Sequence, residues 1–348
     1  MPAFVPGLQL ARDYWFDVVA PIIDAQVSSY DRAAALIGDG SDVVGFDTEQ
    51  STDHGWGPRV FVFLADDVDR QVIPALTRVV DEALPDTFQG YPTRFSLRDE
   101  GPVRHQVFLT TVGGFVRELL GFDPRSPMTV RHWLQTPTQR LRSFTAGAVF
   151  EDGPGDLTEV RRHLQWYPDA VWIYVLGCQW RRLDQEEPFV GRCGQVDDEL
   201  GSAIVAARLV RDLVRLCFLI EREYAPYSKW LGTAFARLPC GPHLVPSMTA
   251  SLRASAWRER EPYLTTAFEM VAAKFNALGL TEPVEPTARP FYNRPFLVLG
   301  SGRFVDACMA ATPLRELGFL GSIDQFVDST DALSRPDTVA QVTASLWA

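Results

Sequence analysis

The residues best suited to bind a phosphorylated ligand lie in one short segment between two apolar runs. Gly40 and Ser41 follow the first run, and Asp53 precedes the second. Glycine lets the main chain approach a phosphate closely, while a serine hydroxyl and nearby amides donate to its oxygens. We place Asp53 at the start of the next strand, where a carboxylate would hold Mg²⁺ against the same triphosphate. The pattern favours a Mg-nucleotide site, and its plainer interpretation is a turn after a strand.

The elements that must position these residues alternate between strand and helix in the first third of the chain. Short apolar runs predict strands over residues 33–37, 60–64, 93–97 and 106–112. Apolar residues recurring at three or four positions predict helices over residues 8–26 and 67–84. This alternation is typical of a sheet with helices packed against it.

The character of the sequence changes after about residue 126, and helical patterns dominate from residue 157 onward. The clearest predicted helices cover residues 202–223 and 257–278, while proline and glycine punctuate a connecting region over residues 127–155. A length of 348 residues suits two domains. We therefore divide the chain into an α/β domain, residues 1–125, and a mainly helical domain, residues 126–348.

A set of motifs extends along most of the chain. They occupy residues 45–47, 51–54, 56–59, 147–152, 167–172, 185–192, 198–202, 224–232 and 321–329. With these motifs the chain resembles the DUF4037 family of nucleotidyltransferase-like proteins. The Gly40-Ser41 loop and the acidic residue after it are similar to the signature of the polymerase-β-type nucleotidyltransferase superfamily. The resemblance implies an α+β fold, in which a nucleotidyltransferase-like mixed β-sheet with helices precedes a mainly helical C-terminal domain.

The resemblance also implies an activity. A nucleotidyltransferase would move a nucleoside monophosphate from Mg²⁺-bound ATP, or another NTP, to a hydroxyl of a small molecule or a protein. Gly40 and Ser41 would hold the phosphates, and Asp53 would ligate the metal and take part in catalysis. The family pattern has a second carboxylate two residues further along the strand, on the same face.

This sequence has Gly55 at that second position, so one metal ligand is missing. Asp47, Glu49 or His54 would have to substitute, and we choose Asp47, since His54 would face the other side of an extended strand. Gly55 therefore favours a second hypothesis from a different class. In it, the chain is a nucleotide- or metabolite-binding protein that has lost transfer chemistry.

Other predicted site residues lie further along the chain. A third carboxylate, which would bind metal or activate the acceptor, is predicted at Glu151 or Asp152, with Asp198 and Glu199 as second choices. The resemblance implies that Lys229 reaches the triphosphate, although it is equally typical of a solvated side chain.

Arg192 is a further predicted phosphate ligand. Its alternative interpretation, which we favour at this point, is a structural ion pair with Glu186 or Glu187.

Bulk composition narrows the partners. The net charge is −11, and a nucleic-acid backbone needs clustered cations, so we expect a nucleotide and a small acceptor rather than nucleic acid. Five scattered cysteines predict neither a zinc site nor a disulfide framework. No apolar run is long enough for a membrane span and no signal peptide is recognisable, so we expect a cytoplasmic protein. The acceptor, the nucleobase and the oligomeric state stay open.

Overall fold

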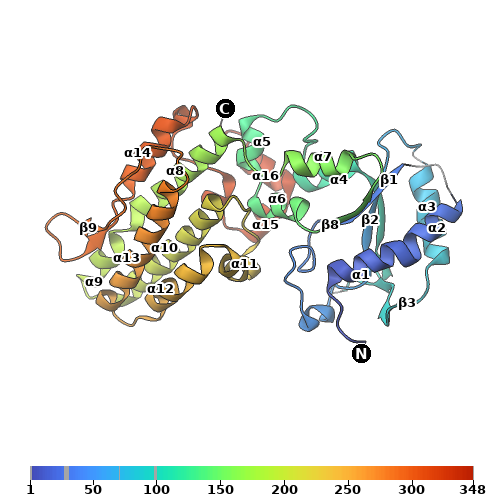
Figure 1. The fold of residues 1–348 in the computed structure, drawn as a ribbon, viewed down its shortest axis with the longest axis horizontal. Helices are drawn as coiled ribbons and strands as arrows, with labels where there is room; N and C mark the ends of the chain where they lie inside the picture. The colour runs from blue at the N-terminus through green and yellow to red at the C-terminus, as the bar shows by residue number, and fades with distance from the viewer. Residues whose placement is uncertain (1, 27–30, 70, 98–99, 348) are drawn as a thin grey trace. The chain divides into compact units, whose positions relative to one another are not determined.

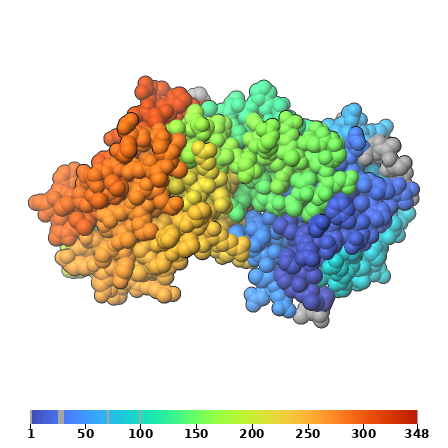
Figure 2. Space-filling model, viewed as in Figure 1, coloured from blue at the N-terminus to red at the C-terminus, as the bar shows by residue number. Residues whose placement is uncertain are grey.

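The computed structural model describes residues 2–26, 31–69, 71–97 and 100–347. The chain forms two compact units (Figure 1). The first contains residues 1–128 and 139–165, and the second contains residues 129–138 and 166–348. Residues 139–165, which the sequence assigned to the second domain, thus belong to the first unit. Figure 2 shows their green surface continuous with the blue surface of the N-terminal residues.

A mixed four-stranded sheet in the order β7-β2-β1-β8 organises the first unit. Its strands are β1 (Arg32–Leu36), β2 (Val60–Leu64), β7 (Val107–Thr111) and β8 (Ala148–Asp152). β1 pairs antiparallel with both β2 and β8, whereas β2 and β7 are parallel. The strands predicted over residues 33–37, 60–64 and 106–112 are confirmed. No strand was predicted from the sequence over residues 148–152, which form β8.

Both faces of the sheet are covered. Successive side chains of a strand point to opposite faces, and every residue of β2 is apolar, so both faces must be buried. Val60 and Val62 lie in one buried cluster with Tyr14, Trp15 and Ile23 of the N-terminal helical segment. That segment consists of α1 (Gly7–Tyr14), the π-helical turn η1 (Trp15–Val19) and α2 (Ala20–Gln26), and it matches the helix predicted over residues 8–26.

Aromatic side chains cover the opposite face. The Phe61 and Phe63 rings lie 5.0 and 5.5 Å from the ring of Phe115, and Phe115 in turn lies 6.1 Å from Phe144. The remaining helices of this unit are α3 (Val72–Ala83), α4 (Val112–Leu120), α6 (Thr138–Thr145) and α7 (Asp156–His163). Short strand pairs join β3 (Thr87–Phe88) to β4 (Tyr91–Pro92) and β5 (Arg94–Phe95) to β6 (Arg104–His105).

The second unit is mainly helical. Its longest helices are α8 (Asp169–Glu186), α10 (Glu199–Ile220) and α13 (Trp257–Asn276). The others are α5 (Val130–Gln135), α9 (Phe189–Gly194), α11 (Leu231–Arg237), α12 (Gly241–Arg253), α14 (Gly302–Ala311), α15 (Thr330–Leu333) and α16 (Pro336–Val342). The short segments are η3 (Ser228–Trp230), η4 (Arg315–Leu317), η5 (Ile323–Gln325), β9 (Arg289–Pro290) and β10 (Leu297–Val298).

Buried aromatic residues hold these helices together. Trp180 of α8 stacks on Phe304 of α14 with ring centroids 4.5 Å apart. Trp172 Nε1 of α8 donates to the Leu219 carbonyl oxygen of α10 at 2.8 Å. The helices predicted over residues 202–223 and 257–278 are confirmed as α10 and α13, and the chain has the α+β fold class predicted from its sequence. Among the described helices, none combines the length and the apolar character needed to cross a bilayer.

Candidate functional site

The predicted phosphate-binding residues lie on the connection between β1 and β2, residues 37–59. Because these strands are antiparallel, with Ala35 opposite Phe61, the C-terminal end of β1 and the N-terminal end of β2 lie at the same end of the sheet. Gly40, Ser41 and Asp53 therefore lie on one connection at that end of the sheet.

A buried ion pair closes this connection. Arg59 Nη2 lies 2.5 Å from Asp42 Oδ1, and Arg59 Nε lies 3.1 Å from Asp42 Oδ2. The same guanidinium donates to the Asp39 carbonyl oxygen at 3.0 Å. The two side chains are only 8% and 3% exposed, so this paired contact fixes both ends of the connection. Sequence reasoning missed the pair, and the signal was an aspartate directly after Gly40-Ser41 and an arginine directly before the strand.

The ion pair explains the glycine at position 40. A Cβ atom on Gly40 would lie 2.1 Å from Arg59 Nη2 and 2.2 Å from Asp42 Oδ1, and its φ is +148°. Close approach of the Asp42 and Arg59 side chains therefore requires glycine there. The space beside the Gly40 Cα is filled by protein side chains, where the sequence suggested a phosphate.

Asp47 is held by two protein donors. Its Oδ2 accepts from the main-chain N–H of Gly7 at 2.7 Å and from Trp56 Nε1 at 3.1 Å. These contacts tie the start of α1 to the connection. They give Asp47 a structural role, and its predicted role as a metal ligand stays a prediction.

The position of Asp53 corrects one expectation. Asp53 ends a 3₁₀ helix, η2 (Glu49–Asp53), and β2 begins only at Val60, so Asp53 is not the first residue of a strand. Gly55 has φ of +62°, which is left-handed rather than extended. Residues 53 and 55 therefore do not share one face of a strand. The Asp53 side chain is 68% exposed, and its Oδ1 lies 2.6 Å from Nδ1 of His54.

The predicted third carboxylates lie on the edge strand β8, away from the end of the sheet at which the β1–β2 connection lies. Antiparallel pairing puts Glu151 opposite Ala34 and Asp152 opposite Ala33, near the start of β1, whereas residues 37–59 follow its end. Glu151 Oε2 accepts from Trp15 Nε1 at 3.2 Å. Asp152 accepts from the amides of residues 155 and 158, which lie at the start of α7. The structure thus does not bring Glu151 or Asp152 to Gly40-Ser41.

The second choices, Asp198 and Glu199, also have structural partners. Asp198 caps α10 by accepting from Gly201 N at 2.7 Å. Glu199 accepts from Trp257 N at 2.8 Å and lies 3.4 Å from the buried Arg260 guanidinium. Both contacts hold the ends of helices.

The two predicted cations of the second unit are exposed and lie over aromatic rings. Arg192 lies 5.4 Å from the centroid of Phe189, and Lys229 lies 5.0 Å from that of Trp230. The predicted ion pair of Arg192 with Glu186 or Glu187 is replaced by other contacts of the two glutamates. Glu186 pairs with Arg208 at 2.6 Å, and Glu187 accepts main-chain hydrogen bonds.

A metal clamp is not assembled by these residues. Across the described parts of the chain, no group of three His, Cys, Asp or Glu side chains is placed to hold a metal ion. Asp47 is bonded to Gly7 and Trp56, and Glu151 and Asp152 lie elsewhere on the sheet. The residues present therefore do not fit the two-carboxylate clamp that the resemblance implies for Mg²⁺.

A cation does lie beside the Gly40-Ser41 turn. Arg140 Nη1 of α6 lies 3.1 and 3.3 Å from the two carboxylate oxygens of Asp39, the residue before Gly40. Asp39 is 79% exposed. The Arg140 side chain itself is only 12% exposed, so the pair joins a largely buried guanidinium to an exposed carboxylate beside the turn.

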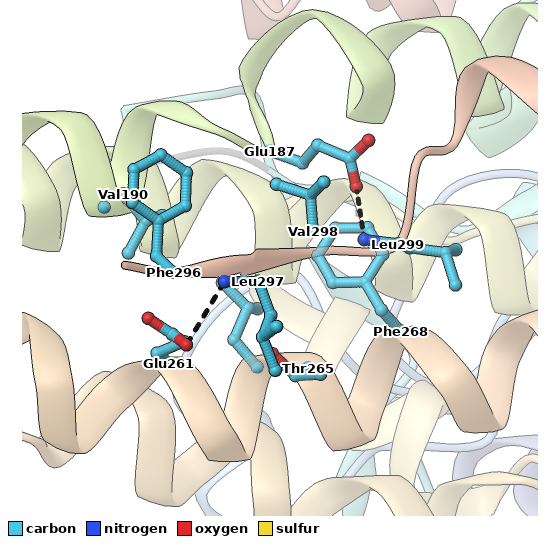
Figure 3. A pocket seen from close by; sticks show the side chains of 11 residues that line it. Glu187, Val190, Glu261, Thr265, Phe268, Phe296, Leu297, Val298 and Leu299 are labelled. Carbon is cyan, nitrogen blue, oxygen red and sulfur yellow. Dashed lines mark hydrogen bonds between the residues drawn. The ribbon is translucent and has the colours of Figure 1, made fainter. Parts of the chain in front are cut away.

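A separate buried carboxylate lies in the second unit. Glu187 accepts from the amides of Leu299 and Ser301 at 3.1 and 2.8 Å, beside a small cavity of about 20 Å³ that also contains Phe268 and Phe296 (Figure 3). Burial raises the pKa of Glu187 to about 7, against the lowering effect of the hydrogen bonds from Ser301 and Gly300. A cavity of this volume suits a water molecule, not a metabolite.

Comparison with known proteins finds one family model that matches the middle of the chain. The DUF4037 family, described as a domain of unknown function, matches residues 133–231. The motifs over residues 147–152, 167–172, 185–192 and 198–202 lie within the matched residues. A search of curated proteins gives no match.

Among solved structures, the chain is similar to a nucleotidyltransferase-like protein from Exiguobacterium sibiricum 255-15. The two are 10% identical with a TM-score of 0.33, over 97% of this chain and 90% of the other. Likeness at this level defines neither a fold nor an activity for the chain.

Proposed function

We propose that the chain binds a nucleotide or a related phosphorylated metabolite at the β1–β2 connection, and that metal-dependent nucleotidyl transfer by it is weak or absent. The observation that carries this proposal is that two carboxylates on that connection already bind protein groups. Asp42 is committed to Arg59, and Asp47 to Gly7 and Trp56. Transfer needs a metal clamp that positions and neutralises the triphosphate.

Three features support binding at this place. The Gly40-Ser41 turn lies at one end of the sheet, and Ser41 offers a hydroxyl. Arg140 lies next to the turn, where it forms an ion pair with the exposed Asp39. Arginine is suited to phosphate because its planar guanidinium donates two parallel hydrogen bonds. An acidic chain of net charge −11 needs such a local cation to hold an anion.

Calorimetric titration with ATP tests this proposal. We expect binding by the unmodified chain, and a loss of about tenfold in affinity for Arg140→Gln, the usual effect of removing one charged hydrogen bond. Arg117→Gln is the matched control. It removes the same charge from the same unit, but Arg117 pairs with Asp123 beyond the opposite ends of β2 and β7. Absence of ATP binding, or equal losses in both variants, would contradict the proposal.

Nucleotidyl transfer to a small-molecule or protein hydroxyl is the second candidate. It is favoured by Asp53, whose exposed carboxylate lies on the same connection as Gly40 and Ser41. Mg²⁺ often uses only one or two protein carboxylates together with substrate phosphates. Pyrophosphate release that depends on Mg²⁺ and is lost in Asp53→Ala would favour this candidate over the first.

A further inference from the structure

A cavity lined by several arginines lies within the helical unit. It has a volume of about 230 Å³, and four of its lining residues are arginines: Arg182, Arg208, Arg211 and Arg215. The three arginines of α10 are spaced at three and four residues, which places them on one face of the helix. Arg182 comes from α8, which packs beside α10 through a hydrogen bond from Gln179 Nε2 to the Asp212 carbonyl oxygen at 3.0 Å.

The remaining wall is the segment 324–328, part of a family-like motif that the proposed function does not use. This segment is attached to the arginines by main-chain contacts. Arg182 donates to the Gln325 carbonyl oxygen, and Arg215 donates to that of Asp324. The wall is thus fixed to α8 and α10, and the cavity is a built feature of the unit.

The cations differ in how firmly they are held. Arg182 is anchored by Asp212, whose side chain is 4% exposed, through contacts of 3.2 and 3.3 Å. Arg211 lies 3.3 Å from Asp328, which is 73% exposed, and Arg208, itself 55% exposed, pairs with Glu186. Exposed pairs of this kind contribute little stability, so Arg208 and Arg211 are able to turn toward an incoming anion.

Arg215 adds a largely buried cation to the cavity. Its side chain donates to a carbonyl oxygen, a neutral acceptor, and burial lowers its pKa. The Asp324 carboxylate, whose two oxygens accept from Thr138 at 2.9 and 3.1 Å, offsets part of this charge, as does Asp212. With four arginines against three aspartates in its lining, the cavity keeps an excess of positive charge, which favours an anion beside the buried cation.

We propose that this cavity binds the phosphate or diphosphate group of a small metabolite, as a site separate from the β1–β2 connection. Several guanidinium groups converging on one space are suited to the oxygens of such a group. The volume is below the range of cavities that enclose a whole drug-sized molecule. It fits a phosphorylated end, with the half-exposed Phe326 at the wall beside it.

Titration with inorganic pyrophosphate at low ionic strength tests this site. We expect binding by the intact chain and a loss of about tenfold in each of Arg208→Gln and Arg211→Gln, because each removes one charged hydrogen-bond donor. Arg181→Gln is the control on the same helix as Arg182. Arg181 pairs with Asp184 at 2.6 Å and lies over Phe319, and the cavity is not lined by it. Its affinity should stay within about twofold of the intact chain.

Hydrogen exchange with and without pyrophosphate then locates the ligand. We expect protection of residues 321–329 and of α10 around Arg211. Protection confined to residues 37–59, an unchanged affinity in Arg211→Gln, or an equal loss in Arg181→Gln would overturn the proposal. Because the two sites lie on different segments, failure here leaves the proposal for the β1–β2 connection unaffected.

Discussion

Asp42 and Arg59 show how single residues decide the character of the β1–β2 connection. Their paired contact is almost fully buried, and Gly40 packs directly on it. Breaking a buried pair leaves one uncompensated charge, which costs more than removing both charges together.

We therefore predict that Asp42→Ala and Arg59→Ala each lower the free energy of unfolding by about 3–5 kcal/mol. The double variant should lose clearly less than the sum of the two, since no lone buried charge remains. Denaturant unfolding of the three variants measures this. Additive losses would mean that the pair is not the stabilising unit.

Gly55 lies on the same connection, close to the start of β2. Its φ is +62°, and a Cβ atom there would lie 3.0 Å from the Leu97 carbonyl oxygen. The left-handed backbone alone costs a non-glycine residue about 1–2 kcal/mol, with aspartate at the low end.

Gly55→Asp should therefore destabilise the chain and should not raise nucleotidyl transfer, because an aspartate at position 55 would not share a strand face with Asp53. Gly45→Asp is the matched control, since Gly45 has φ of +71° and nothing within 4 Å of a built Cβ. We expect Gly55→Asp to lower the thermal midpoint more than Gly45→Asp does. A gain of pyrophosphate release in Gly55→Asp would restore the strand interpretation.

At the scale of elements, Glu187 joins the end of α8 to the start of α14 by accepting from the amides of residues 299–301. Burial raises its pKa to about 7, while a carboxyl in the unfolded chain titrates near about 4.3. Between these values the folded chain binds more protons than the unfolded chain, so stability falls as pH rises through this window and levels off above it.

We predict that the free energy of unfolding falls by about 2 kcal/mol more between pH 5 and pH 7.5 in the intact chain than in Glu187→Gln. Glu186→Gln removes the same charge from the neighbouring residue, whose carboxylate contacts the exposed Arg208, and should keep the slope of the intact chain. Parallel pH profiles for the intact chain and Glu187→Gln would contradict this assignment.

Local patterns predicted the elements that carry strong periodicity. The Val60–Leu64 strand and the α10 and α13 helices follow directly from their apolar spacing. β8 could not be assigned to the first sheet, because the partner of a strand lies outside its own sequence. Asp53 was misplaced because its carboxylate precedes an apolar run, while Gly55, Gly57 and Pro58 separate it from the strand.

The candidate sites were predicted unevenly for similar reasons. The Gly40-Ser41 turn was found because its residue types are local signals. The arginine-lined cavity was not, because arginines on the polar face of a helix carry no local signal for a ligand site. The segment 324–328 that completes the cavity is more than 100 residues away in sequence, and only the fold brings it to α10.

At the scale of the whole molecule, the chain combines an α/β unit and a helical unit, and each contains one of the two anion sites that we propose. The β1–β2 connection has Arg140 beside Gly40-Ser41, and the helical unit has the arginine-lined cavity. Among the described residues, no group of three or more His, Cys, Asp or Glu side chains is placed to hold a metal ion. This combination favours recognition of phosphorylated molecules over metal-dependent transfer.

Pyrophosphate release from ATP in the presence of Mg²⁺ tests this account most directly. It should be measured for the unmodified chain, for Asp53→Ala and for a blank without protein, alongside calorimetric binding of ATP. The account predicts that ATP binds to the unmodified chain while its pyrophosphate release equals that of Asp53→Ala and of the blank. Release well above the blank that disappears in Asp53→Ala would contradict it and identify a working nucleotidyltransferase.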